Sequence, residues 1–324
     1  MKKLLTKKNL AVLLLIIVVY AVLLACDQLG VFNRQSKALL VPIGINIMLA
    51  VSLSLLVGFL GELSLGHAGF MSVGAYAGCM FTIHMDLPMA VELPLAMLIG
   101  GVVAGLFGFL IGIPALRLKG DYLAIVTLAF GEIIRSVLNN FSLVGGAGGL
   151  NGIPKYSNYT IVYVAMVITI IVIANLVHSR HGRAICSIRD NVIASESMGI
   201  PVVYYKLLAF VAAAVFAGVA GVLYGHNLGI LKPSTFDFNK SIEILVMVVM
   251  GGMGSLPGAV IAAVVITVLP EALRGLSDYR MLIYAVVLIA MMLLNNNARF
   301  NEFKQRLFSK RAARHGAKLT KEGE

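Results

Sequence analysis

Long apolar runs, separated by short polar stretches, follow one another along most of the chain. Several runs reach the roughly 17 to 25 residues that a helix needs to cross the hydrocarbon of a membrane. They lack the ten-residue alternating strands of a membrane barrel. The pattern therefore predicts an all-α integral membrane protein, a polytopic helix bundle of about ten transmembrane segments, some short or broken at glycine-rich stretches. The expected segments are 10–26, 38–60, 66–84, 89–113, 121–141, 159–178, 203–225, 241–253, 256–272 and 278–294.

The basic residues between and beyond these segments predict the orientation of the chain, because lysine and arginine accumulate on the cytoplasmic side. With both termini inside, most of them fall in the cytoplasm, although much of the excess lies in the C-terminal tail. We therefore expect a basic cytoplasmic N-tail at 1–9, one transmembrane domain at 10–294 with a cytoplasmic loop at 179–202, and a basic cytoplasmic C-tail at 295–324. A secretory signal ending at a lipid-attachment cysteine, Cys26, is the alternative for the first segment.

Composition agrees with a protein whose solvent is lipid. Hydrophobic residues make up 59% of the chain and charged residues 13%, and the mean hydropathy is +0.93, whereas about a quarter of the residues of a soluble domain are charged. The net charge of +11 does not indicate nucleic-acid binding, because the basic residues lie in loops and tails at membrane edges. Cys26, Cys79 and Cys186 are spaced too far apart for a metal knuckle, and two of them lie in apolar runs, so we expect no disulfide framework.

Two apolar regions, 58–69 and 251–258, are interrupted by glycines in the same way. Paired glycine-rich breaks are typical of a transport pathway, since freed backbone groups can face substrate or water only at a cavity. Close packing of helices is the alternative explanation of each glycine. The polar residues beside the glycines favour the pathway. The candidate pathway residues in the two breaks are Glu62, Ser64, Gly66, His67, Gly252, Gly254 and Ser255.

Few charged residues lie inside the expected segments, among them Glu92, Glu132, Arg135 and Glu243, with Asp121 and Lys206 near segment ends. Each costs at least about 2.5 kcal/mol at the bilayer centre unless it is paired or hydrated, so we expect them to face the bundle interior. Glu132 and Arg135 stand three residues apart and can pair on one helical face. A structural ion pair is the first interpretation and a gate is the alternative, which keeps Glu132 among the candidate pathway residues.

The sequence shows no catalytic machinery. The glycine-rich stretch 142–158 is the clearest outer loop, but no Gly-Lys-Ser/Thr follows its glycines, and the chain contains no phosphate-binding loop. A His-Glu-x-x-His zinc motif is also missing. We therefore expect no enzyme activity and no ATPase site in this chain.

The longest polar interruption, 179–202, contains the start and stop signals of a short helix over 190–199. Asp190 or Asn191 can serve as N-cap, Gly199 can take the left-handed conformation at the C-terminal end, and Pro201 prevents continuation. Such a helix is only about 12 Å long and must lie at the surface. It either docks into a groove of a partner, through Val192, Ile193 and Met198, or is an ordinary solvated loop.

Several motifs carry a family resemblance that covers roughly residues 40–295. The stretch 179–202 resembles the cytoplasmic coupling loop of ATP-binding cassette importer permeases, and the chain as a whole is most similar to the branched-chain amino acid permease family, M-type subunit. One departure is Ser195, where the broader importer motif often has alanine. The other motifs are Gly61-Glu62-Leu-Ser64-Leu-Gly66-His67-Ala-Gly69-Phe70, Gly74-Ala75-Tyr76, Leu116-Arg117-Leu118-Lys119-Gly120-Asp121-Tyr122, Gly148-Gly149-Leu150-Asn151-Gly152-Ile153-Pro154 and Met250-Gly251-Gly252-Met253-Gly254-Ser255-Leu256-Pro257-Gly258.

The resemblance implies a multi-pass permease of the cytoplasmic membrane that works with a second permease subunit, as a heterodimer, two cytoplasmic ATP-binding subunits and an extracytoplasmic substrate-binding protein. The chain itself would bind no cofactor, because the partner subunits use the ATP. The implied cargo is leucine, isoleucine, valine or a similar amino acid, with urea, short amides or aromatic acids as alternatives; a stand-alone channel or secondary transporter is the alternative of another class. The residues that the resemblance assigns to coupling with the ATPase are Arg183, Arg189, Asp190, Asn191, Ala194, Glu196 and Gly199.

Overall fold

The computed structural model describes residues 34–85, 87–118 and 120–273, together with the single positions 20, 286 and 289. Apart from those single positions, the expected segments 10–26 and 278–294 and both basic tails lie outside the described residues. The chain divides into two compact units, Met1–Val268 and Leu269–Glu324. The described residues of the second unit are all helical.

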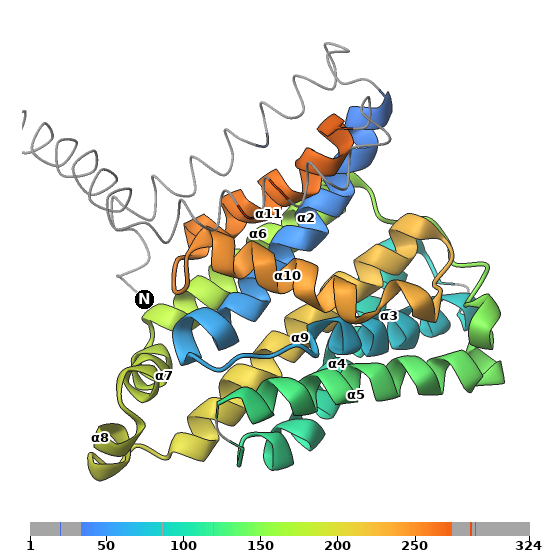
Figure 1. Ribbon diagram of the computed structural model, residues 1–324. Helices are drawn as coiled ribbons and strands as arrows, with labels where there is room; N and C mark the ends of the chain where they lie inside the picture. The colour runs from blue at the N-terminus through green and yellow to red at the C-terminus, as the bar shows by residue number, and fades with distance from the viewer. Residues whose placement is uncertain are drawn as a thin grey trace, which may run out of the picture. The chain divides into compact units, whose positions relative to one another are not determined.

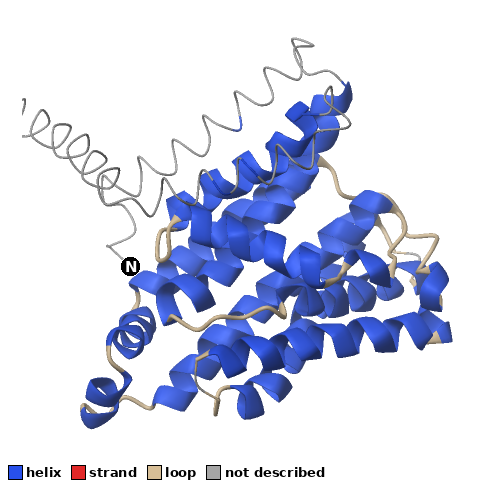
Figure 2. Cartoon of the chain, in the orientation of Figure 1, coloured by secondary structure: helices blue, strands red, loops and turns tan. Residues whose placement is uncertain are grey.

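The described part of the first unit is built from helices, with one isolated antiparallel bridge between Leu150 and Leu231 (Figures 1 and 2). In chain order the elements are α2 (Arg34–Ser54), the π-helix η1 (Leu55–Leu60), α3 (His67–His84), α4 (Met89–Ala115), α5 (Asp121–Asn140), the 3-10 helices η2 (Ser142–Val144) and η3 (Gly146–Gly148), α6 (Tyr159–His178), α7 (Arg180–Asp190), α8 (Val192–Ser197), α9 (Val202–Leu228), the 3-10 helix η4 (Pro233–Thr235), α10 (Phe238–Gly251) and α11 (Leu256–Ala272).

Every expected segment between residues 66 and 272 coincides closely with one of these helices, so the all-helical architecture is confirmed for the described residues. Within the part of the chain that the structure describes, four helical stretches are long and apolar enough to cross a membrane, and α11 is a shorter apolar helix. The total of about ten segments and the orientation stay predictions. The four stretches are Lys37–Leu60, Met89–Ala115, Tyr159–His178 and Val202–Leu228.

The polar stretch 179–202 differs from its prediction, because it holds two helices instead of one helix at 190–199. The additional helix is α7, which was not predicted from the sequence. Its Gly182, Ile185 and Ile188 are spaced three residues apart and are all buried, which is the periodicity of a helix with one packed face. The expected segment 38–60 also differs in detail, since its last six residues form the π-helix η1.

The core of the bundle lies where α9 packs against α3 and α4 (Figure 1). A Cβ atom placed on Gly74 of α3 would lie 2.2 Å from Cα of Gly218 on α9. One placed on Gly218 would lie 2.6 Å from the carbonyl oxygen of Gly100 on α4, and one on Gly100 would lie 2.7 Å from the carbonyl oxygen of Gly74. Because helices in lipid associate mainly through close packing, these glycines let three backbones meet.

The bundle has two distinguishable ends, and α9 connects them. Helix α9 begins next to α8, and its 27 residues correspond to about 40 Å of helix. Near its other end, Ser157 Oγ donates a hydrogen bond to the carbonyl of Leu223 at 2.7 Å. We name the first end the α8 end, and we name the second the loop end because the connections 141–158 and 229–237 meet there through the bridge between Leu150 and Leu231.

The glycine contact predicts that Gly218→Val destabilises the chain. The three added carbon atoms, the Cβ first among them, have no space between α3 and α4, and overpacking of this kind costs about 1–3 kcal/mol. The measurement is the thermal unfolding midpoint in detergent, which is monitored through the loss of the monodisperse size-exclusion peak on heating. Gly148→Val is the matched control, because a Cβ at Gly148 meets nothing within 4 Å; equal midpoints for the two variants would contradict the packing argument.

Candidate functional site

The first glycine-rich break is the non-helical segment 61–66, which connects η1 to α3. Gly61 begins it with a φ of +79°, a conformation that glycine adopts without steric penalty. The freed backbone is satisfied by neighbouring groups: the amide of Glu62 donates to the carbonyl of Leu56 at 3.1 Å, and the amide of Leu65 donates to Thr127 Oγ1 at 3.0 Å. A Cβ on Gly66 would lie 2.3 Å from the carbonyl oxygen of Thr127, so α5 packs directly against this break.

The second break, between α10 and α11, lies against the first. Gly252 and Gly254 have φ angles of +90° and +82°. A Cβ placed on Gly58, in η1, would lie 2.6 Å from the amide nitrogen of Gly254, so the two segments approach at backbone distance. Ser255 Oγ accepts a hydrogen bond from the amide of Gly258 at 3.2 Å and so closes the break at the start of α11. The two breaks that the sequence pairs by pattern are therefore neighbours in space.

Arg189, at the C-terminal end of α7, connects the polar loop to both breaks. Its Nη1 donates a hydrogen bond to the carbonyl oxygen of Gly58 at 3.1 Å and lies 3.4 Å from the position of a Cβ on Gly254. A Cβ on Gly61 would lie 2.7 Å from Arg189 Cγ, so the stem of the arginine runs along the first break. Its Nη2 pairs with Asp190 Oδ1 at 2.9 Å, which restrains the guanidinium. The structure thus brings Arg189 and Asp190 together with Gly254.

Glu62 is engaged in an ion pair with Lys206 on α9. Lys206 is buried, and the side chain of Glu62 is largely buried. A buried charge without a partner would be strongly unfavourable, so each residue makes the other tolerable. The pair fastens the first break to the start of α9.

Helix α8 has the end signals that the sequence predicts. Asn191 is the N-cap, with Oδ1 accepting a hydrogen bond from the amide of Ala194 at 3.0 Å, whereas the other candidate, Asp190, pairs with Arg189. Gly199 has a φ of +79° and donates its amide hydrogen to the carbonyl of Glu196 at 2.9 Å. Helix α8 is thus defined at both ends by local hydrogen bonds.

Large apolar side chains of α8 and of the turn after it are uncovered. Ile193 is 78% exposed and Met198 is 81% exposed. Ala194 and Glu196 are exposed beside them, whereas Ser195 is buried. The serine that departs from the importer motif therefore lies outside the exposed surface.

The first turns of α7 hold the remaining residues of the polar loop. Arg183 Nη1 donates to the carbonyl of His178 at 3.3 Å and so satisfies the C-terminal end of α6. Arg183 is therefore a structural link between α6 and α7 and does not join the contacts around Arg189.

Cys186 also lies on α7. Burial raises the pKa of its thiol, so this cysteine is protonated at neutral pH.

His67 begins α3 and is fully buried. Its Nε2 lies 2.9 Å from Ser52 Oγ, whose own hydrogen is donated to the carbonyl of Leu49 at 2.9 Å. Nε2 must then be the donor, which leaves Nδ1 of the neutral ring as an acceptor. This Nδ1 and the buried Ser64 Oγ have no hydrogen-bond partner among the described residues. The start of α3 therefore presents two unsatisfied polar atoms inside the bundle.

Glu132 lies apart from Arg189, on α5 beside a shallow hollow that Leu65 of the first break also lines. It pairs with Arg135 at 2.7 Å, as the spacing predicts, and both side chains are partly exposed. The pathway candidates thus fall into two groups: Glu62, Gly252, Gly254 and Ser255 near Arg189, and Ser64, Gly66, His67 and Glu132 around the start of α3 and the face of α5.

Lys206 and Gly58 are parts of this site that were not among the predicted site residues, although Lys206 stood among the charges expected to face the bundle interior and Gly58 begins the first glycine-rich region. Lys206 lies within the first two turns of the apolar segment that follows Pro201, and a charge at such a position indicates a partner because it is costly when unpaired. The role of Gly58 depends on Arg189 and Gly254, which are distant in the sequence, and no local pattern reveals it.

Comparison with known proteins places the site in a family context. The chain is 36% identical over 284 residues to the high-affinity branched-chain amino acid transport system permease protein LivM of Salmonella typhimurium and, equally, to LivM of Escherichia coli; each alignment covers 77% of this chain and 66% of the relative, just under two thirds of its length. LivH of Salmonella typhimurium, named as a permease protein of the same kind of system, is 25% identical over 273 residues, with 76% of this chain and 88% of LivH covered. No solved structure matches the chain significantly.

The sequence model of the family described as "Branched-chain amino acid transport system / permease component" matches residues 37–294. This range includes both glycine breaks, Arg189 and the whole of α8. The chain has several apolar helices long enough to cross a membrane and is a multi-pass cell membrane protein. It belongs to the family of branched-chain amino acid transport system permease components.

Proposed function

We propose that this chain is a permease subunit of an ATP-binding cassette importer that carries leucine, isoleucine, valine or similar amino acids into the cell. It works with a second permease subunit, two cytoplasmic ATP-binding subunits and an extracytoplasmic substrate-binding protein. It has about ten transmembrane segments, both termini are cytoplasmic, and the α8 end faces the cytosol. The observation that carries this proposal is the link from the exposed helix α8, through Arg189, to the two glycine breaks.

Helix α8 is the docking element for the ATP-binding subunits. Ile193 on α8 and Met198 in the turn directly after it are exposed, and α8 is too short to cross a membrane and is bounded by polar residues. Exposed apolar side chains on such a helix suit the hydrophobic groove of a partner. The caps at Asn191 and Gly199 keep the helix formed, so it can transmit a displacement.

Movement of α8 reaches the pathway through α7. When the ATP-binding subunits change their separation, α8 and α7 shift, and Arg189 carries the shift to Gly58 and Gly254. Backbone that has left the helical pattern can change its φ and ψ angles with less loss of hydrogen bonding than an intact helix, so the breaks are the natural hinges. The partner subunits must bind the two states with different affinity for this equilibrium to shift.

The pathway runs past the start of α3 and the face of α5, towards the second permease subunit. His67 Nδ1 and Ser64 Oγ offer unsatisfied polar atoms there. The pair of Glu132 and Arg135 is partly exposed on α5, and charges on a face that meets lipid would cost at least about 2.5 kcal/mol each near the bilayer centre. A protein partner or a hydrated pathway covering this face removes that cost.

Reconstitution tests the proposed function directly. Liposomes that contain the complete importer, with ATP available to the ATP-binding subunits and leucine-loaded binding protein on the opposite side, are expected to accumulate labelled leucine. Liposomes with this chain alone are expected to match empty liposomes, because the sequence contains no ATP-binding loop. Sustained leucine uptake by the chain alone would instead establish a channel or a secondary transporter.

The left-handed residue that ends α8 gives a second prediction. Gly199→Val is expected to lower the amount of leucine transported per ATP hydrolysed several-fold, because a β-branched residue at a φ of +79° is strained by about 1–3 kcal/mol and the end of α8 rearranges. The measurement is the ratio of uptake to phosphate release in the same liposomes. Gly199→Asn is the matched control, since asparagine tolerates this conformation and should keep most of the coupling. Wild-type coupling in the valine variant would show that α8 does not transmit the force.

A further inference from the structure

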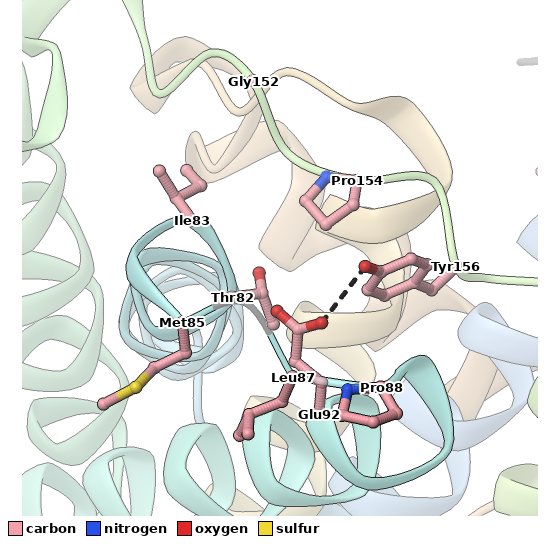
Figure 3. A pocket seen from close by; sticks show the side chains of 9 residues that line it. All are labelled: Thr82, Ile83, Met85, Leu87, Pro88, Glu92, Gly152, Pro154 and Tyr156. Carbon is pink, nitrogen blue, oxygen red and sulfur yellow. Dashed lines mark hydrogen bonds between the residues drawn. The ribbon is translucent and has the colours of Figure 1, made fainter.

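A pocket of about 540 Å³ opens at the loop end of the bundle, the end opposite α8 (Figure 3). It lies between the end of α3, the start of α4 and the connection that leads to α6. Its polar lining includes Thr82, Glu92 and Tyr156, and the rest of its wall is mostly aliphatic side chains and prolines. None of the functional residues considered above belongs to it.

The carboxylate of Glu92 is the chemically distinctive group of this pocket. Glu92 is only 1% exposed, and its Oε2 accepts a hydrogen bond from the Tyr156 hydroxyl at 3.1 Å (Figure 3). Its other oxygen, Oε1, is buried and has no hydrogen-bond partner among the described residues. A buried carboxylate with a single neutral donor is unfavourable, because its desolvation is not repaid.

None of the described residues lining the pocket pairs with this charge. His226, which stacks on Tyr156 and interacts with Glu92 electrostatically, directs its two ring nitrogens to Val222 and Thr82 instead of to Oε1. No lysine or arginine is among the described residues that line the pocket. The hydroxyl hydrogen of Thr82 is donated to the carbonyl of Cys79 at 3.0 Å, so it is not available to Oε1. The position of Glu92 in the first turn of α4 makes an acidic residue tolerable there through the helix dipole, but it does not account for an oxygen left without a donor.

The pocket therefore fits a ligand that carries a primary ammonium group next to an aliphatic chain. An ammonium supplies the missing donor and the opposite charge at once. Ile83, Leu87, Pro88 and Pro154 provide an apolar wall for a branched hydrocarbon chain. Both features are combined in a free aliphatic amino acid.

We propose that this pocket is an outer cargo site of the permease, in which Glu92 Oε1 accepts a hydrogen bond from the α-ammonium group of the transported amino acid. This inference rests on the proposed import of amino acids and adds a specificity residue to it. The pocket at the loop end faces the compartment from which the substrate-binding protein delivers its cargo. The permease would thus recognise the ammonium group and the side chain of the amino acid a second time, after the substrate-binding protein has released it.

Ligand binding tests the site in the assembled importer in lipid nanodiscs, without the binding protein. Saturation-transfer difference NMR is recorded with leucine, with isopentylamine, which keeps the chain and the ammonium group, and with 4-methylpentanoate, which keeps the chain and a carboxylate. Leucine and isopentylamine are expected to bind at least about tenfold more tightly than 4-methylpentanoate, because only they carry a donor with the charge that Glu92 needs. Equal binding of all three would overturn the proposal without any mutation.

A matched pair of variants locates the effect. Glu92→Gln keeps the size of the side chain and its acceptor for Tyr156, and should abolish the preference for isopentylamine, whereas Asp121→Asn, at an exposed carboxylate on α5, should leave it unchanged. If both variants keep the preference, Glu92 is not the ammonium site. Leucine uptake by the wild-type importer, measured in parallel, separates the two claims: uptake without a Glu92-dependent preference contradicts this site alone, and absence of uptake contradicts the proposed function.

Discussion

The hydrogen bond from the Arg189 guanidinium to the backbone carbonyl of Gly58 is the interaction on which the rest of the arrangement depends. Backbone that leaves the helical pattern inside a membrane protein must be satisfied by other groups, and a charged donor makes a stronger hydrogen bond to a carbonyl than a neutral one does. Because Gly254 lies against Gly58, the same side chain reaches both breaks. Helices α7 and α8 therefore cannot shift far without either moving the breaks or losing this bond.

The breaks are surrounded by parts of the bundle that resist deformation. Gly74, Gly100 and Gly218 bring α3, α4 and α9 to backbone contact, and a close-packed interface of this kind has little room to adjust. The ion pair between Glu62 and Lys206 ties the first break to α9. The fold thus combines a close-packed three-helix core with two glycine breaks that the polar helices at one end contact. In the proposed function, these breaks are the hinges through which the chain responds to ATP used by its partner subunits.

Much of the fold follows from local patterns in the sequence. The apolar runs predict α3, α4, α5, α6, α9, α10 and α11 to within three residues at each end, and the caps of α8 follow from side-chain chemistry, with Asp190 or Asn191 at its start and Gly199 at its end. Helix α7 was not predicted, because only three positions of a polar stretch, Gly182, Ile185 and Ile188, carry its helical spacing, and that they are buried is a property of the tertiary structure. The contact of Arg189 with Gly58 and the isolation of Glu92 Oε1 depend on residues far apart in the chain, so they require the tertiary structure.

The most direct test of the account removes the guanidinium and measures coupling. In liposomes that hold the complete importer, Arg189→Ala is compared with Arg180→Ala, which removes the same charge from an exposed position on α7. The account predicts that Arg189→Ala still assembles with the ATP-binding subunits and hydrolyses ATP, while the leucine transported per ATP falls several-fold below the value for Arg180→Ala. Equal transport per ATP in the two variants would contradict the claim that Arg189 carries the movement to the glycine breaks.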